Sequence, residues 1–95
     1  MPQVIYAPEA DNDLVGIADV IARDKPEAAR RWVQNIRETC ELSAMQPEMG
    51  ELRNGFGVAG CRCFSVGNYA IFFRSVNGGI EVARIVHGSR DMRNL

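Results

Sequence analysis

The spacing of the hydrophobic residues changes once along this chain, and that change constrains the fold more than any other feature. Between Leu14 and Ala44, apolar side chains recur every three or four positions, as they do on one face of a helix. From Gly60 onward they recur at every second position, as they do on one face of a strand. A helical half followed by a sheet half within 95 residues predicts a single α+β domain over residues 1–95.

The first half predicts two helices joined by a short connection. A β-prone run at residues 3–7 precedes Pro8, which suits the first turn of a helix ending near Arg23. We expect Asp24 to cap the second helix, with Pro26 in its first turn. The two apolar stripes are Leu14, Ile17, Ala18 and Ile21, then Ala29, Trp32, Val33, Ile36, Cys40 and Ala44. The short connection makes the two helices an antiparallel hairpin.

The second half predicts three strands after a glycine-rich loop at residues 50–60. The strands are 61–66, 69–76 and 80–87, separated by a tight turn at Gly67-Asn68 and a second turn at 77–79. The expected order is therefore β-α-α-β-β-β. We expect the helical hairpin to pack on one face of a small, mainly antiparallel sheet.

Two-residue turns assign the strand residues to the two faces of the sheet. The face toward the helices should carry Arg62, Phe64, Val66, Tyr69, Ile71, Phe73, Ile80, Val82, Arg84 and Val86. The outward face should carry Cys61, Cys63, Ser65, Ala70, Phe72, Arg74, Glu81, Ala83, Ile85 and His87. A three-residue turn would shift this assignment. The same register places Arg74 opposite Glu81 and predicts a cross-strand ion pair.

Charge and composition argue against several classes of protein. The net charge of −1 does not suit a strongly basic nucleic-acid-binding surface, although the arginines near the end of the chain leave a local basic tail. No apolar run reaches the roughly 18 residues of a membrane span, and the N-terminus lacks the features of a signal peptide. We therefore expect a cytoplasmic protein with reduced thiols.

No metal or cofactor site is predicted. Cys61 and Cys63 are accompanied only by Cys40 and His87, which are split between a helix and the sheet, so small packing side chains are the better interpretation. The glycines of the loop lack the Lys-Ser/Thr pair of a phosphate-binding loop. His87 is the only histidine; it suits either a structural role at a strand end or acid–base chemistry.

Several motifs, taken in order, resemble the RelE/ParE toxin superfamily, and its ParE branch in particular. The first half contributes Ala10, Asp13-Leu14 and Ile17, then Asp24-Lys25-Pro26-Glu27-Ala28-Ala29. The second half contributes Gly60-Cys61-Arg62, then Val66-Gly67-Asn68-Tyr69-Ala70-Ile71-Phe72-Phe73-Arg74, Ile80-Glu81-Val82, and Arg84-Ile85-Val86-His87-Gly88-Ser89-Arg90-Asp91. The resemblance runs from about residue 4 to residue 91 and implies the fold predicted above.

The superfamily implies two mechanisms, which depend on different residues. RelE-like members cut mRNA on the ribosome with basic residues, and in this chain three of those positions fall on Cys61, Cys63 and Ala70. Only Arg90 keeps a matching basic group. Because each lost charge-stabilising donor reduces the rate by roughly 10²–10³-fold, we expect no catalytic residues and no enzymatic activity.

The ParE resemblance implies a toxin that inhibits DNA gyrase by protein–protein contact. It also implies a ParD-like antitoxin that neutralises the toxin in a hetero-oligomer. A RelE-like mRNA endonuclease and a degenerate toxin that only binds its antitoxin remain the alternatives. We expect the antitoxin to cross the helical hairpin and the sheet edge with an extended or helical segment. The candidate contacts with target or antitoxin are Arg30, Arg37, Arg62, Arg74, Arg84, His87, Arg90 and Arg93, with Arg31 beside them on the second helix.

Overall fold

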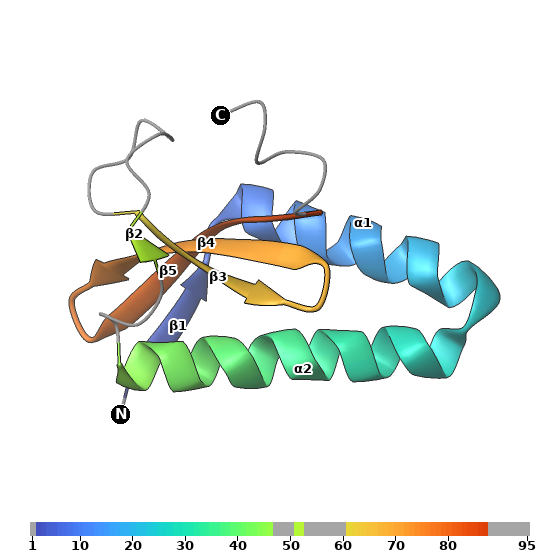
Figure 1. Cartoon of the computed structure of the whole chain (residues 1–95), viewed down its shortest axis with the longest axis horizontal. Helices are drawn as coiled ribbons and strands as arrows, with labels where there is room; N and C mark the ends of the chain where they lie inside the picture. Colours follow the sequence, from blue (N-terminus) through green and yellow to red (C-terminus); the bar gives the residue numbers. More distant parts are fainter. Residues whose placement is uncertain (1, 47–50, 53–60, 88–95) are drawn as a thin grey trace.

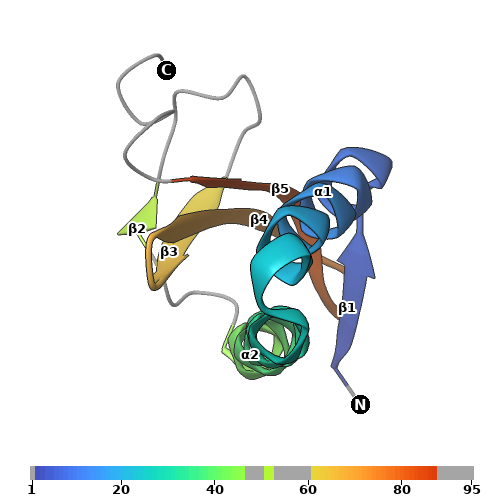
Figure 2. The same ribbon diagram turned by 90° about the vertical axis from the view of Figure 1, so that its right-hand side faces the viewer.

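A helical hairpin covers one face of a five-stranded sheet. The computed structural model describes residues 2–46, 51–52 and 61–87. The elements are β1 (Gln3–Tyr6), α1 (Pro8–Asp24), α2 (Pro26–Met45), β2 (Glu51–Leu52), β3 (Arg62–Val66), β4 (Tyr69–Val76) and β5 (Gly79–His87). The sheet order is β1-β5-β4-β3-β2, with only β1 and β5 parallel. Both helices lie on the same side of it (Figures 1 and 2), so the predicted fold class is confirmed.

The two helices begin and end close to the predicted positions. Each starts with a proline in its first turn, and Glu9 and Asp11 lie where the helix dipole favours negative charge. The predicted cap is wrong: Asp24 is the last residue of α1, and Lys25 occupies the N-cap position of α2 without a side-chain cap. Pro26 explains the boundary, because the residue before a proline is pushed out of the helical region. Neither helix of the described residues is long and apolar enough to cross a membrane.

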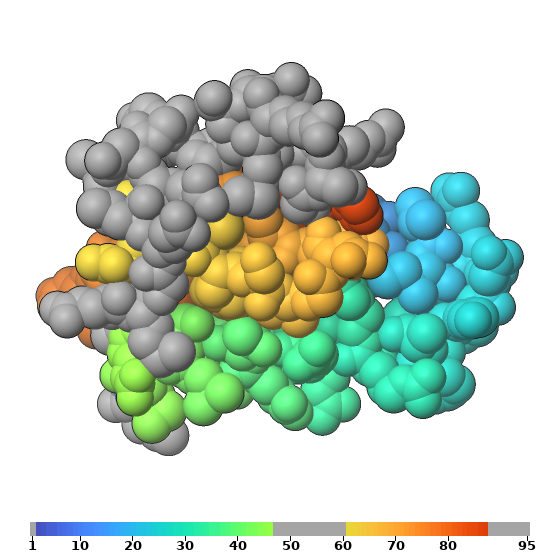
Figure 3. Space-filling model, viewed as in Figure 1, coloured from blue at the N-terminus to red at the C-terminus, as the bar shows by residue number. Residues whose placement is uncertain are grey.

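The main hydrophobic core lies between the helices and the sheet. Ala10 and Leu14 of α1 and Ile36 and Cys40 of α2 are buried there, as the helical stripes predict for Leu14, Ile36 and Cys40. The sheet contributes Ile71, Phe73, Ile80, Val82 and Ile85. Figure 3 shows β3 and β4, in yellow and orange, packed directly against α2, in green.

The β3–β4 hairpin has the predicted register, with Val66 opposite Tyr69. Gly67 adopts a positive φ of 58°, which the tight turn requires. The predicted loop at residues 50–60 is partly wrong, because Glu51–Leu52 forms β2 and pairs antiparallel with β3. The remainder of that loop lies outside the described residues.

A β-bulge in β5 corrects the assignment of the last strand residues to faces. Phe72 pairs with Arg84 but Phe73 pairs with Val82, so Ala83 is the extra residue in β5. One extra residue inverts the alternation of all side chains beyond it. Ile85 and His87 therefore face the helices, whereas Arg84 and Val86 lie on the opposite face. The prediction was the reverse for all four residues.

A second, smaller cluster lies on the sheet face opposite the helices. It consists of Cys61, Cys63, Ala70 and Phe72, with Val86 packed against them. The four main members were predicted on this face and are found there. Their side chains are nonetheless buried, with 1–6% of their surface exposed, so this part of the face is not open to solvent.

Candidate functional site

The predicted contact residues do not converge on a single site. Arg30 and Arg37 lie on α2, Arg62 on β3, Arg74 on β4, and Arg84 and His87 on β5, while Arg90 and Arg93 lie outside the described residues. Two grooves on the two sides of α1 account for three of these residues, namely Arg30, Arg37 and His87.

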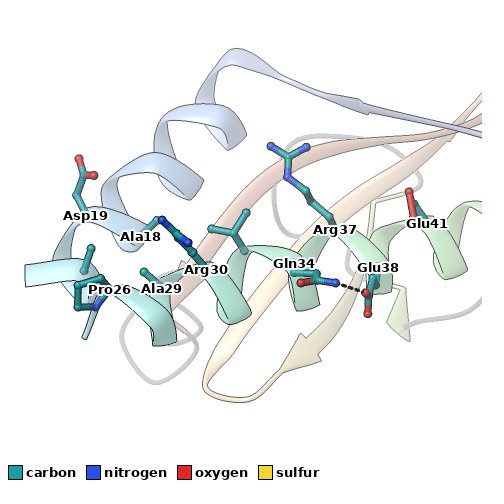
Figure 4. A pocket seen from close by; sticks show the side chains of 11 residues that line it. Ala18, Asp19, Pro26, Ala29, Arg30, Gln34, Arg37, Glu38 and Glu41 are labelled. Atoms are coloured by element: carbon teal, nitrogen blue, oxygen red, sulfur yellow. Dashed lines mark hydrogen bonds between the residues drawn. The ribbon is translucent and has the colours of Figure 1, made fainter. Parts of the chain in front are cut away.

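The first groove runs between α1 and α2 and has a volume of about 650 Å³. Its apolar lining is Ala18, Ala22, Pro26, Ala29 and Val33, and its polar lining is Asp19, Arg30, Gln34, Arg37, Glu38 and Glu41. In Figure 4, Arg30 and Arg37 extend from α2 toward the side of α1. Because alanines supply most of the apolar lining, the backbone of another element can approach closely here. The groove therefore combines a shallow apolar floor with charged edges.

The polar edge of the first groove is only weakly tied to the rest of the chain. Arg30 lies 3.9 Å from Glu27, and both side chains are about four-fifths exposed. An exposed pair of this kind contributes roughly 0–1 kcal/mol. Gln34 donates to Glu38 across one helical turn at 3.0 Å. These side chains can exchange their contacts for those of a partner at little loss.

Arg37 lies over the ring of the half-buried Tyr6, which joins β1 to the buried Cys40 of α2. Its guanidinium carbon is 5.9 Å from the centre of the Tyr6 ring, within cation–π range. The Tyr6 hydroxyl hydrogen-bonds the Cys40 thiol beneath it. Burial raises the pKa of Tyr6, and it raises the pKa of Cys40 to about 11. Cys40 is therefore a protonated packing residue at neutral pH rather than a nucleophile. The sequence predicted Cys40 as part of the apolar stripe of α2, but it did not predict the contact between Cys40 and Tyr6.

The second groove lies between α1 and the β4–β5 hairpin and has a volume of about 560 Å³. It is lined by Asn12, Asp13, Gly16, Ile17, Val20, Tyr69, Ile85 and His87. The His87 ring meets the edge of Tyr69 at 5.4 Å between centroids, and Tyr69 meets Trp32 at 5.2 Å. The bulge at Ala83 places His87 in this groove instead of on the outward face where the sequence predicted it.

Asp13 anchors α1 to the strand segment beyond the bulge. Its carboxylate accepts bonds from Arg84 Nε at 2.7 Å and from a terminal nitrogen of the same guanidinium at 3.2 Å. It also accepts a bond from the Ile85 backbone N–H at 2.9 Å. Asp13 appears in the sequence motif, but its partners depend on a bulge that no local pattern shows. Arg84 thus has a clear structural partner.

The remaining candidates on the sheet also have structural roles. Arg74 meets Glu81 at 2.7 Å, which confirms the predicted cross-strand ion pair. Arg62 is half-buried on β3. Cys61, Cys63 and Ala70, which occupy the positions of basic residues in RelE-like toxins, are buried. Burial raises the pKa of the Cys61 thiol. On this face, Arg74 and Arg84 could stabilise a phosphate only by giving up their carboxylate partners.

Comparison with known proteins agrees with the architecture. A family model described as the ParE toxin of the type II toxin–antitoxin system parDE matches residues 4–92. A solved structure described as the chromosomal ParDE TA system from P. aeruginosa is similar, with 26% identity and a TM-score of 0.74. That match covers 92% of this chain and 96% of the other. Comparison with curated proteins finds no match. Because the family model spans nearly the whole sequence, the chain belongs to the ParE toxin family of parDE type II toxin–antitoxin systems.

Proposed function

We propose that this toxin inhibits DNA gyrase by protein–protein contact and that a ParD-like antitoxin neutralises it. Membership of the ParE family supports the gyrase target. The solved relative is described as a ParDE TA system, which supports an antitoxin partner. Since gyrase acts on the chromosome, the proposed place of action is the cytoplasm. The first groove is the observation that carries the proposal for the antitoxin.

The first groove suits a helical or extended protein segment with acidic residues. Its alanine-rich floor admits apolar side chains, and Arg30 and Arg37 on its edge can pair with carboxylates. Arginine is also favoured at the centres of protein interfaces because its planar guanidinium forms two parallel bonds to a carboxylate. For the antitoxin, the groove singles out Arg30 and Arg37 among the predicted contact residues. The other predicted residues remain proposed contacts for target or antitoxin, namely Arg62, Arg74, Arg84, His87, Arg90 and Arg93.

The sheet gives less support to the alternative of a RelE-like mRNA endonuclease. Metal-free RNA cleavage needs groups that accept a proton from the 2′-hydroxyl and that stabilise charge on the phosphate. At the corresponding positions the chain has Cys61, Cys63 and Ala70, all buried and uncharged. Arg74 and Arg84, which lie on the same face of the sheet, are paired with carboxylates. Contact-based inhibition is therefore the function that we propose.

Binding to purified antitoxin tests the first groove. Arg30→Glu and Arg37→Glu should each slow association and weaken binding about tenfold or more at low salt, with a smaller effect at high salt. Arg31→Glu is the matched control, because Arg31 is an exposed arginine of α2 outside the groove lining. Equal affinity for all three variants and the unmodified toxin across salt concentrations would show that the antitoxin binds elsewhere.

The order of cellular events tests the target. Induction of the toxin alone should block replication and start the DNA-damage response before translation falls, and co-expression of the antitoxin should prevent both. Translation arrest as the first event would favour the endonuclease. Normal growth despite folded toxin in the cells would favour a degenerate toxin that only binds its antitoxin.

A further inference from the structure

Gly16 lies in the interior of α1, where no contact with the described residues 2–46, 51–52 and 61–87 requires a glycine. A side-chain carbon built at this position would meet no atom of these residues within 4 Å. Glycine is nevertheless one of the poorest residues for a helix interior, because it gives up the most backbone freedom. Packing among the described residues therefore does not explain why Gly16 is a glycine. A bare helix backbone is useful where another chain approaches closely.

The surroundings of Gly16 are apolar and accessible. Gly16 lines the second groove together with Ile17 and Val20 from the same helix, and Tyr69 and Ile85 lie opposite. Val20 keeps 60% of its surface exposed. The one carboxylate in the lining, Asp13, is already bonded to Arg84 and to the Ile85 N–H. An uncharged apolar side chain is therefore the group that this groove suits best.

The two grooves are separated only by the exposed surface of α1. Asp19 lines the first groove, and its neighbour Val20 lines the second. Gly16 precedes this pair by one helical turn, so it lowers the surface of α1 at the point where a chain would pass from one groove to the other. At Gly16, α1 therefore presents no side chain to a segment that passes between the grooves.

We propose that the antitoxin segment in the first groove crosses α1 over Gly16 and inserts an apolar side chain into the second groove, between Val20 and Tyr69. This inference rests on the proposed antitoxin partner. The inference adds the route of the antitoxin segment and the chemistry of the side chain that it inserts into the second groove. The antitoxin segment would then carry acidic residues where it meets Arg30 and Arg37, and a small residue where it crosses Gly16. An aliphatic or aromatic residue would follow in the part that enters the second groove.

Substitutions on α1 test the route with purified antitoxin and the complete toxin. Gly16→Leu should block the crossing and weaken binding more than tenfold, and Val20→Ser should weaken it about fivefold by removing an apolar contact. Val15→Ser is the matched control, because Val15 is 58% exposed on the same helix but lines neither groove. It should change the affinity less than twofold. Gly16→Ala should raise the thermal midpoint of the free toxin, which shows that the site tolerates a side chain.

The outcomes separate this inference from the proposed function. If Gly16→Leu and Val20→Ser bind like the unmodified toxin while Arg37→Glu binds weakly, the antitoxin uses the first groove but does not cross α1, and the inference is wrong. If none of the three affects binding, the first groove is not the antitoxin site either. If Val15→Ser weakens binding as much as Val20→Ser, the segment runs along the Val15 side of α1 instead of crossing at Gly16, and the inference is wrong.

Discussion

Gly79 and Gly16 differ in how much space the surrounding structure leaves for a side chain. At Gly79 the edge strand β1 passes so close that an added side-chain carbon would overlap the Gln3 carbonyl oxygen and lie 2.7 Å from the Gln3 nitrogen. Only a glycine allows the parallel pairing of Gln3 with Gly79 and the bond from the Gln3 N–H to the Gly78 carbonyl at 2.8 Å. At Gly16 no atom of the part of the chain that the structure describes imposes such a limit.

Replacement of Gly79 by alanine should therefore destabilise the toxin. The free energy of unfolding should fall by about 1–3 kcal/mol, because β1 must shift away from β5 to relieve the overlap. Urea unfolding followed by circular dichroism measures the change. Gly16→Ala is the control with the same chemical change and the opposite sign, since alanine stabilises a helix interior by about 1 kcal/mol relative to glycine. A stabilising effect of Gly79→Ala would show that β1 does not lie against Gly79.

At the scale of elements, the carboxylate of Asp13 joins α1 to the part of β5 beyond the bulge. β1 pairs with β5 only as far as Val82, and the next stretch of that edge meets α1 instead. Asp13 accepts the Ile85 N–H there, so a sheet edge is satisfied by a helix side chain. The same contact holds the segment that places His87 beside Tyr69.

Asp13→Ala should lower the free energy of unfolding by about 1–3 kcal/mol, since it removes two charge-assisted bonds to Arg84 and leaves the Ile85 N–H without its carboxylate acceptor. Asp19→Ala, at an exposed position of the same helix, should stay within about 0.5 kcal/mol of the unmodified toxin. Chemical denaturation of both variants makes the comparison. Equal stability of the two would show that the anchor contributes nothing to folding.

At the scale of the whole molecule, buried thiols should make the stability depend on alkaline pH. Folding raises the pKa of Cys40 from 9.0 to about 11 and also raises the pKa of Cys61, so the folded state retains protons that the unfolded state has lost. For Cys40 this difference lowers the free energy of unfolding as pH rises from about 9 to 11, by up to about 1.4 kcal/mol per pH unit. The raised pKa of Cys61 acts in the same direction. Below pH 8 both states hold these protons and the stability should not change on their account.

Urea midpoints measured from pH 7 to 11 test this pH dependence. Cys40→Ala should lower the overall stability because it leaves a cavity, yet it should flatten the decline between pH 9 and 10 because one titrating group has been removed. Tyr6, whose pKa burial also raises, should continue the decline above pH 10 in both proteins. An identical pH profile for the variant and the unmodified toxin would rule out Cys40 as a source of the alkaline loss.

The sequence alone was enough to predict every described element except β2, the order of these elements, the register of the β3–β4 hairpin and the family. Pro8 and Pro26 mark the starts of the helices, and the apolar stripes define their buried faces. Gly67 sets the β3–β4 hairpin, and the turn between Val76 and Gly79 sets the β4–β5 hairpin, in which Arg74 meets Glu81. All of these features depend on residues close together in the chain or on a regular spacing. Local propensity and periodicity therefore suffice to predict them.

The grooves and the side chains that line them depended instead on contacts between distant segments. One extra residue at Ala83 moved His87 to the helix side of the sheet and Arg84 to the other side, from which Arg84 reaches Asp13 at the edge of β5. No local pattern distinguishes a bulged strand from a regular one. Asp13 and Arg84 are 71 positions apart, and Tyr6 and Cys40 meet only after β1 has docked beside α2. A sequence pattern states which face of an element is apolar, but the packing of helices on the sheet sets the distance between two faces. For this toxin, that packing created the two grooves on either side of α1 and placed Gly16 between them.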